Sequence, residues 1–195
     1  MKRAFDLFFS FVLLALLALP LCAIAGVILL KEGRPVLFRQ PRIGQHGVTF
    51  SILKFRTMRV AKGATAAVTS GNRDERITPT GHWLRRHRMD EFPQLLNVMM
   101  GHMSLVGPRP EVPNYVDPED PLWRKVLSVR PGITGTDSLA FRNEGQQLAE
   151  ATDADSFYRE VILPEKLKLQ CAYVDQQSLI GDLRILFRTL GALRG

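Results

Sequence analysis

The sequence has few of the residues on which disulfide and metal scaffolds depend. Of its 195 residues two are cysteines, Cys22 and Cys171, so a disulfide framework is excluded. The four histidines are scattered, and no cysteine–histidine cluster has the spacing of a zinc site. Both cysteines have apolar or helix-forming neighbours, which is typical of core or lipid-facing positions in a reducing compartment.

The sequence also lacks the motifs of nucleic-acid recognition. It has 26 Lys and Arg against 19 Asp and Glu, a net charge of +7 that attracts phosphate groups. Without a helix-turn-helix, a zinc finger or an aromatic RNA-stacking motif, we expect no nucleic acid as a partner. The remaining candidates are the phosphates of anionic lipids and of phosphorylated small molecules.

Charge is nearly absent from the N-terminal segment. Residues 4–30, AFDLFFSFVLLALLALPLCAIAGVILL, contain one charged side chain, Asp6, and exceed the about 20 apolar residues that span a bilayer. The run is longer than the apolar core of a signal peptide, about 7–15 residues, and it continues past the small-residue AIA site. We therefore expect a membrane anchor that is retained.

Two topologies of this anchor remain open. Basic residues flank both of its ends: Lys2, Arg3, Lys31 and Arg34. Because cytoplasmic flanks are normally the basic ones, this favours a re-entrant hairpin kinked at Pro20. Residues 4–19 as a helix reach roughly 24 Å, short of the ~30 Å hydrocarbon core. A lone proline is also tolerated in a spanning helix, which remains the alternative.

The rest of the chain predicts a small α/β domain, mostly helical with short strands. Residues 36–39 and 48–55 have the pattern of two strands joined by a turn rich in Pro and Gly. Residues 59–76 have no periodicity and indicate a mobile loop. We therefore divide the chain into a membrane anchor, residues 1–34, and a domain at the membrane face, residues 35–195.

Several helices are expected in this domain. Thr80 is a suitable N-cap for one helix, and a second is expected to begin at Asp90–Glu91. The segment 128–135 reads as a turn-rich loop, while Pro164 either starts or kinks a later helix. Residues 180–195 place apolar side chains at helical spacing with arginines between them. This amphipathic helix either lies on an anionic membrane surface or packs on the core.

The most unusual stretch is RRHRMDEFPQLLNV, in which an acidic pair, Asp90 and Glu91, follows four basic side chains. The ordinary role of such a pair is to cap a helix and favour its dipole. A chemical role is the alternative, because nearby guanidinium groups match phosphate oxygens. These belong to Arg85, Arg86, Arg88 and Arg109, the last of them in GPRP. Carboxylates in this setting suit Mg²⁺ and a diphosphate, one holding the metal and the other attacking phosphorus or orienting a group.

Four further basic residues are candidate phosphate ligands. Lys54 and Arg56 are two apart in a predicted strand, so both point to one face and either line the phosphate site or form a solvated edge. Arg42 in QPRIG and Arg130 in RPGITG are weaker candidates, because loop arginines are often simply solvated. The residues alone therefore predict a membrane-associated enzyme that acts on a diphosphate.

Four motifs, in this order after the N-terminal segment, resemble those of one protein family: LKFRTM, RRHRMDEFPQLLNV, MSLVGPRPE and RPGITG. The family is the bacterial sugar transferases, small monotopic phosphoglycosyl transferases, and the likeness covers nearly the whole chain. It implies transfer of a sugar-1-phosphate from a UDP-sugar to undecaprenyl phosphate with release of UMP. It also implies a re-entrant anchor in the lipid of the bacterial inner membrane, with the domain on the cytoplasmic face.

The resemblance assigns roles to the acidic pair and to two arginines. Asp90 would attack the β-phosphorus and form a phosphosugar–aspartyl enzyme. Glu91 would help to hold Mg²⁺, with Asp90 as a second candidate ligand. Arg85 and Arg109 would bind phosphate.

The chain departs from the family pattern at several positions. Leu19 stands where the family usually has serine before the membrane proline, and His102 where it has aspartate. Arg88 adds a positive charge beside the acidic pair, and TDSLAFRNE replaces the common Gln-Val continuation after RPGITG. These departures keep an alternative open, a catalytically silent membrane adaptor that binds anionic lipid and a partner enzyme. The sequence leaves open which UDP-sugar is used, and whether the chain is a monomer or a homodimer.

Overall fold

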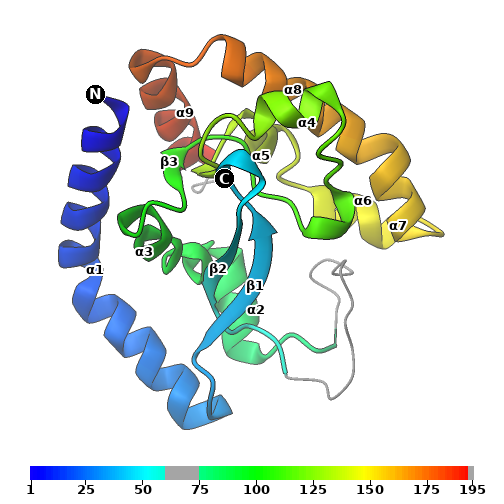
Figure 1. The fold of residues 1–195 in the computed structure, drawn as a ribbon. Coiled ribbons are helices and arrows are strands. Elements are labelled where there is room, and N and C mark those ends of the chain that lie inside the picture. Colours follow the sequence, from blue (N-terminus) through cyan, green and yellow to red (C-terminus); the bar gives the residue numbers. More distant parts are fainter. Residues whose placement is uncertain (60–74, 193–195) are drawn as a thin grey trace.

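A computed structural model describes residues 1–59 and 75–192, and helices predominate in it (Figure 1). The helices are α1 Lys2–Glu32, α2 Pro79–Arg86, α3 Gln94–Met99, α4 Pro121–Val126, α5 Thr136–Ala140, α6 Glu144–Glu150, α7 Ala154–Phe157, α8 Leu163–Asp175 and α9 Leu179–Ala192. The strands are β1 Leu37–Ile43, β2 Thr49–Phe55, β3 Ser104–Val106 and β4 Gly132–Thr134. The predicted mostly helical chain with short strands is confirmed, while the predicted loop 59–76 lies largely outside the described residues.

Helix α1 is long and apolar enough to cross a membrane, and 11% of its most apolar window is buried. Its 31 residues extend about 46 Å at 1.5 Å per residue. Pro20 lies inside the helix, and Figure 1 shows α1 bending about halfway along its length. Proline causes such bends because it removes one backbone hydrogen bond. A long apolar N-terminal helix is thus confirmed, and the re-entrant hairpin stays a prediction.

The first turns of α1 are bound into the domain. Asp6, the one acid of the apolar run, is 2% exposed and accepts a hydrogen bond from Ser104 Oγ at 2.8 Å. Arg3 donates to carbonyl oxygens of α3, and Lys2 forms an ion pair with Asp182 of α9. Each charge near the start of α1 therefore has a partner in the domain.

The C-terminal half of α1 docks against a different part of the same domain. Ile28 is fully buried and packs with Phe55 of β2 and Leu84 of α2. Arg56 donates to the carbonyl oxygens of Glu32, Gly33 and Arg34, at 2.7–2.9 Å, and so satisfies the end of the helix. Both ends of α1 thus contact one domain.

Strands β1 and β2 form the predicted hairpin, an antiparallel pair in the register Leu37↔Phe55 to Ile43↔Thr49. β1 is longer than predicted and continues through Pro41. Proline is tolerated there because β1 has an unpaired edge, where a missing N–H breaks no ladder bond. The hairpin carries Lys54 on its second strand.

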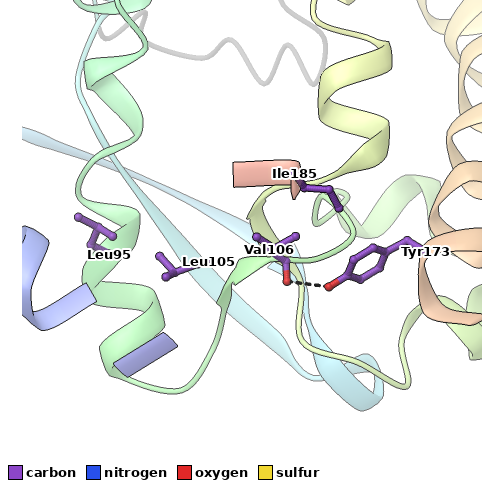
Figure 2. Close-up of a cluster of buried hydrophobic side chains, with 5 residues drawn as sticks. All are labelled: Leu95, Leu105, Val106, Tyr173 and Ile185. Carbon is purple, nitrogen blue, oxygen red and sulfur yellow. Dashed lines mark hydrogen bonds between the residues drawn. The ribbon is translucent and has the colours of Figure 1, made fainter. Parts of the chain in front are cut away.

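A second, parallel pair of strands, β3 and β4, lies against the central core. Figure 2 shows this core, in which side chains from α3, β3, α8 and α9 meet: Leu95, Leu105, Val106, Tyr173 and Ile185. The Tyr173 hydroxyl donates to the carbonyl of Val106 at 3.1 Å. The segment 128–135 was predicted as a loop, but it contains β4. Its three residues pair only with a distant strand, so no local pattern indicates them.

Helix α9 packs on the core with one face and leaves its other apolar face exposed, so each of the two interpretations of the C-terminal segment fits one face. Ile185 is 7% exposed and packs in the core, whereas Ile180, Phe187 and Leu190 are 59–70% exposed. Contact of this outer face with a membrane stays a prediction. Pro164 is the second residue of α8, but the helical backbone continues from α7 through a π turn, Tyr158–Ile162, into α8, so the proline lies within a helical run and does not start a separate helix.

Candidate active site

The acidic pair lies on a tight turn between two helices. After α2 the chain turns at Arg88, whose φ of 52° is left-handed, and Met89–Glu91 then form one 3-10 turn. α3 begins only at Gln94, after Pro93, and no side chain caps it. The prediction that a helix begins at the pair is therefore wrong, and so is the capping role. The proline moves the helix start three residues onward and leaves both carboxylates outside it.

Glu91 is the centre of a three-residue cluster. Lys54 Nζ and Arg109 Nη2 both lie 2.8 Å from the same oxygen of Glu91, Oε1. Lys54 comes from β2, and Arg109 from the loop after β3. The three side chains are only 15–29% exposed, so the charges interact with little screening by solvent. The structure thus brings together three of the predicted site residues.

The charges of this cluster depend on one another. Burial opposes ionisation of Glu91, but the charges of Arg109 and Lys54 hold the pKa of its carboxyl well below the usual range. The charge of Glu91 in turn raises the pKa of Arg109. Burial lowers the pKa of Lys54, and Glu91 offsets only part of that effect. Glu91 is therefore ionised at neutral pH and fixes two cations beside Asp90.

Asp90 has a different environment from its neighbour. Its carboxylate accepts no hydrogen bond from any of the described residues, although it is only partly exposed. Burial raises the pKa of Asp90 above its ordinary 3.8, against the opposing charge of Lys54. A carboxylate of raised basicity without a partner is available to bond to another atom.

Arg85 reaches the same region from α2. Its Nε donates to Thr57 Oγ1 at 2.9 Å, and its charge acts on Asp90. α2 begins at Pro79 with Thr78 as its N-cap, which accepts from the Gly81 amide at 2.9 Å, so the predicted cap at Thr80 is two residues too late. A Cβ on Gly81 would lie 2.1 Å from the Thr57 carbonyl oxygen, so only glycine permits this approach.

The backbone of Arg109 is held from behind by two buried side chains. Its N–H donates to Asp137 Oδ2 at 3.1 Å, and its carbonyl accepts from Gln170 Nε2 at 3.3 Å. Gln170 also donates to Asp137 Oδ2 at 2.7 Å, which closes a three-membered network. Neither residue was predicted. Asp137 lies in TDSLAFRNE, where the sequence departs from the family pattern, and that departure could have drawn attention to it. Nothing in the sequence pointed to Gln170.

Three other predicted phosphate ligands bind backbone elsewhere. Arg56 closes the end of α1, and its side chain does not share a face with Lys54 because β2 ends at Phe55. Arg42 donates to the carbonyl of Pro110 at 3.0 Å, beside Arg109. Arg130 Nε donates to a carbonyl of the turn after α3 at 2.9 Å. None of the three has a contact with Glu91 among the residues described.

The acidic pair can contribute to a metal site only together with other ligands. In residues 1–59 and 75–192 no group of three or more His, Cys, Asp or Glu side chains is placed to hold a metal ion. Mg²⁺ is commonly bound by one or two carboxylates, with water and substrate phosphates completing the shell. Asp90 and the second oxygen of Glu91, Oε2, accept no hydrogen bond from described residues and fit that donor set.

Comparison with known proteins gives consistent matches. Residues 1–194 match the family described as bacterial sugar transferase. A UDP-glucose:undecaprenyl-phosphate glucose-1-phosphate transferase of Escherichia coli is 31% identical over 194 residues, which are 97% of this chain and 39% of that protein. An enzyme of the same name from Caulobacter vibrioides is 34% identical over 195 residues, which are 98% of this chain and 69% of that protein. The exopolysaccharide production protein PSS of Rhizobium leguminosarum is 36% identical over 197 residues, which are 97% of this chain and 93% of that protein.

Proposed function

The chain belongs to the bacterial sugar transferase family, and we propose that it moves a sugar-1-phosphate from a UDP-sugar to undecaprenyl phosphate. The observation that carries this proposal is that Asp90, a carboxylate with no hydrogen bond from the described residues, lies beside the ionised cluster of Glu91, Lys54 and Arg109. The relatives' names support the reaction type and make UDP-glucose the first donor to test. The product would begin the assembly of a glycan on the lipid.

The reaction proceeds in two displacements at one carboxylate. An oxygen of Asp90 attacks the β-phosphorus of the UDP-sugar, and the bond from that phosphorus to the bridging oxygen breaks as UMP leaves. The phosphosugar is then an acyl phosphate on Asp90. A phosphate oxygen of undecaprenyl phosphate attacks the same phosphorus, and the aspartyl oxygen departs as a carboxylate. Two substrates of opposite solubility can thus react at one carboxylate in turn.

The cations around Asp90 would neutralise the diphosphate. Arg109 has five N–H donors and Lys54 has three, so each can bind a phosphate oxygen while keeping its bond to Glu91. Arg85 adds a third positive charge next to Asp90. This environment offsets the charge that gathers on the departing UMP oxygen.

We propose Mg²⁺ as the metal of the reaction. Asp90 and Glu91 would hold it together with the substrate's diphosphate. When bound, the ion would supply further neutralisation of that diphosphate.

The contacts of α1 support a re-entrant anchor on the cytoplasmic face of the inner membrane. Both ends of α1 contact the same domain, whereas a straight spanning helix would carry one end to the opposite side of the bilayer. Basic residues flank both ends as well. Cysteines placed in turn at Met1 and Arg39 should both be labelled by a reagent confined to the cytoplasmic side. Labelling from opposite sides would contradict the hairpin.

Release of UMP tests the proposed reaction. The protein is purified in detergent and incubated with Mg²⁺, undecaprenyl phosphate and a panel of UDP-sugars, beside Asp90→Asn. Asp175→Asn, an exposed carboxylate on α8, is the matched control. We expect release with one sugar, retained in the control and lost in Asp90→Asn. Equal release in all three proteins would exclude Asp90 as the nucleophile, and no release by the folded protein from any donor would favour the silent adaptor.

A further inference from the structure

A large cavity lies between the C-terminal half of α1 and helix α2, and we propose that it binds the phosphate monoester end of the lipid acceptor. This inference rests on the proposed function, because it concerns the second substrate of that reaction. The cavity has a volume of about 1030 Å³. Its lining comes from the C-terminal half of α1 and the residues that follow it, from the segment after β2, and from α2 with its N-cap.

One wall of the cavity is apolar. Ala23 and Val27 are four residues apart on one face of α1, and Trp83 and Leu84 of α2 lie opposite. The α1 wall belongs to a helix on which many other apolar side chains are exposed, Leu30 to 87% for example. A hydrocarbon chain that lies against α1 in the membrane can therefore enter the cavity without leaving an apolar environment.

The remainder of the cavity is strongly basic. Lys31, Arg34 and Arg59 line it, and their side chains form no hydrogen bond or ion pair with the residues that the structure describes. Arg56 adds a fourth positive charge, although its donors are directed at the end of α1. An excess of positive charge beside an apolar wall is complementary to a phosphate at the end of an apolar chain.

Glu32, the one acid among the described lining residues, indicates which kind of phosphate fits. Both carboxylate oxygens of Glu32 are buried and have no hydrogen-bond partner, which is costly for a charged group. A phosphate monoester has a second pKa of about 6 and therefore presents an O–H donor in part of its population. A phosphodiester such as phosphatidylglycerol has no such proton. Glu32 beside several cations thus favours a monoester, the headgroup of a polyprenyl phosphate.

The cavity is lined by segments that also contact the residues around the acidic pair. Arg56 and Met58 line it, while Thr57 between them accepts the hydrogen bond of Arg85. Leu84 of the cavity wall packs against Met89, the residue before Asp90. A phosphate bound in the cavity is therefore next to the elements that carry the nucleophile.

Direct binding tests this site apart from the reaction. Farnesyl phosphate, farnesol and dioleoyl phosphatidylglycerol are titrated into the detergent-purified full chain by calorimetry. One variant combines Arg34→Gln with Arg59→Gln, and another, Ala23→Phe, fills the apolar wall. Arg39→Gln on β1 and Ala18→Phe on α1 are the matched controls, because neither lines the cavity.

We expect farnesyl phosphate to bind, and both cavity variants to weaken it by roughly tenfold or more, as the loss of charge-assisted contacts predicts. The affinity of the unmodified protein for farnesol and for phosphatidylglycerol should be low. It should be no higher than the affinity of the two cavity variants for farnesyl phosphate. Unchanged affinity in both variants would overturn the site, and equal affinity for phosphatidylglycerol would make it a general phospholipid site instead.

Kinetics separate this inference from the proposed function. The UMP burst without acceptor reports on Asp90, whereas the KM for undecaprenyl phosphate reports on the cavity, and we expect that KM to rise in both variants. A normal burst with an unchanged KM would overturn the cavity as the acceptor site. Specific farnesyl phosphate binding with no UMP from any UDP-sugar would sustain a lipid monoester site and reject the reaction.

Discussion

Arg109 donates from Nη2 to Oε1 of Glu91 over 2.8 Å, and this contact joins two segments that are 18 residues apart in the chain. Prolines on both sides of Arg109 restrict its backbone, and Asp137 and Gln170 fix it further. Glu91 sits on a turn whose entry residue, Arg88, has a left-handed conformation that costs about 1 kcal/mol or more. The fold therefore holds a cation against the acidic pair before substrate arrives, which is the preorganisation that charge stabilisation requires.

Glu91→Gln should destabilise the protein at neutral pH, by about 3 kcal/mol, because two buried cations lose their counter-charge. The depressed pKa of Glu91 sets the sign of the pH dependence. Its contribution is present above the unfolded value of 4.5 and is lost as the pH falls through the lower folded value. The difference in free energy of unfolding between the two proteins should therefore narrow below about pH 4.5. For Glu165→Gln, an exposed control, this difference in free energy of unfolding should not change with pH. A difference that stays constant with pH for Glu91→Gln would contradict its pairing with Lys54 and Arg109.

The rate of the UMP burst should fall on the acid side, because Asp90 attacks only when it is ionised. Burial raises the pKa of this carboxyl, so the midpoint of the acid limb should lie above the ordinary 3.8. Single-turnover rates from pH 4 to 8, with folding monitored by circular dichroism, give the midpoint. A rate that stays level down to pH 4 would exclude this environment for Asp90.

Asp90→Asn should raise the melting temperature while it abolishes activity. The raised pKa means that burial of the charged carboxylate opposes folding at neutral pH, and the amide removes that charge at nearly the same volume. The gain should be roughly 2–4 °C, the shift that ~1 kcal/mol produces in a chain of this size. Differential scanning calorimetry in one detergent measures it, with Asp175→Asn as the reference. A lower melting temperature would show that the carboxylate stabilises the fold.

Asp137→Ala should slow the reaction through a shift of Arg109, by about 10–100-fold, because small displacements of positioned groups have effects of that size. Asp137 is fully buried and accepts from both the Arg109 amide and Gln170. Asp137→Asn keeps an acceptor oxygen there and should recover most of the rate. Rates and melting temperatures of the two variants are compared. Equal rates at unequal stability would assign Asp137 a purely structural role.

Gly81→Ala should destabilise the domain by about 1–3 kcal/mol, as overpacking does in a well-packed site. The added methyl would lie 2.1 Å from the Thr57 carbonyl oxygen, so α2 must move and carry Arg85 with it. Denaturant unfolding measures the stability, and the UMP burst measures the displacement of Arg85. Gly191→Ala, where a Cβ meets nothing within 4 Å, is the matched control. Wild-type stability in Gly81→Ala would contradict the close approach.

Elements with a local signal were predictable from the sequence. The hairpin of β1 and β2 followed from alternation and its turn residues, and the long apolar α1 from composition. The start of α2 was misplaced by two residues because Thr78 and Thr80 are both suitable caps, and only contact with Thr57 selects the first. β4 was missed because three residues paired with a distant strand leave no periodicity.

Those site residues that stand in recognisable sequence motifs were predictable. Residues that act through contacts with the backbone of another segment were not. Glu91 and Arg109 were recognised from their motifs, and the structure places them in contact, which no motif had indicated. Arg56 shares a motif with Lys54, but the end of β2 turns it toward the carbonyls of α1. Asp137 and Gln170 act on the Arg109 backbone, and that contact exists only once three segments have come together.

The ion pair between Lys2 and Asp182 joins residues 180 positions apart, so one partner is synthesised near the start of this chain and the other near its end. Helix α1 can enter the lipid long before α9 leaves the ribosome, because synthesis proceeds at about 5–20 residues per second. Until then the Lys2 side chain lacks its carboxylate partner, and the first turns of α1 can be fastened to the domain only through Arg3 and Asp6. A chain that ended before α9 would therefore keep the contacts of Arg3 and Asp6 but lose the ion pair that ties the start of α1 to the C-terminal part of the domain.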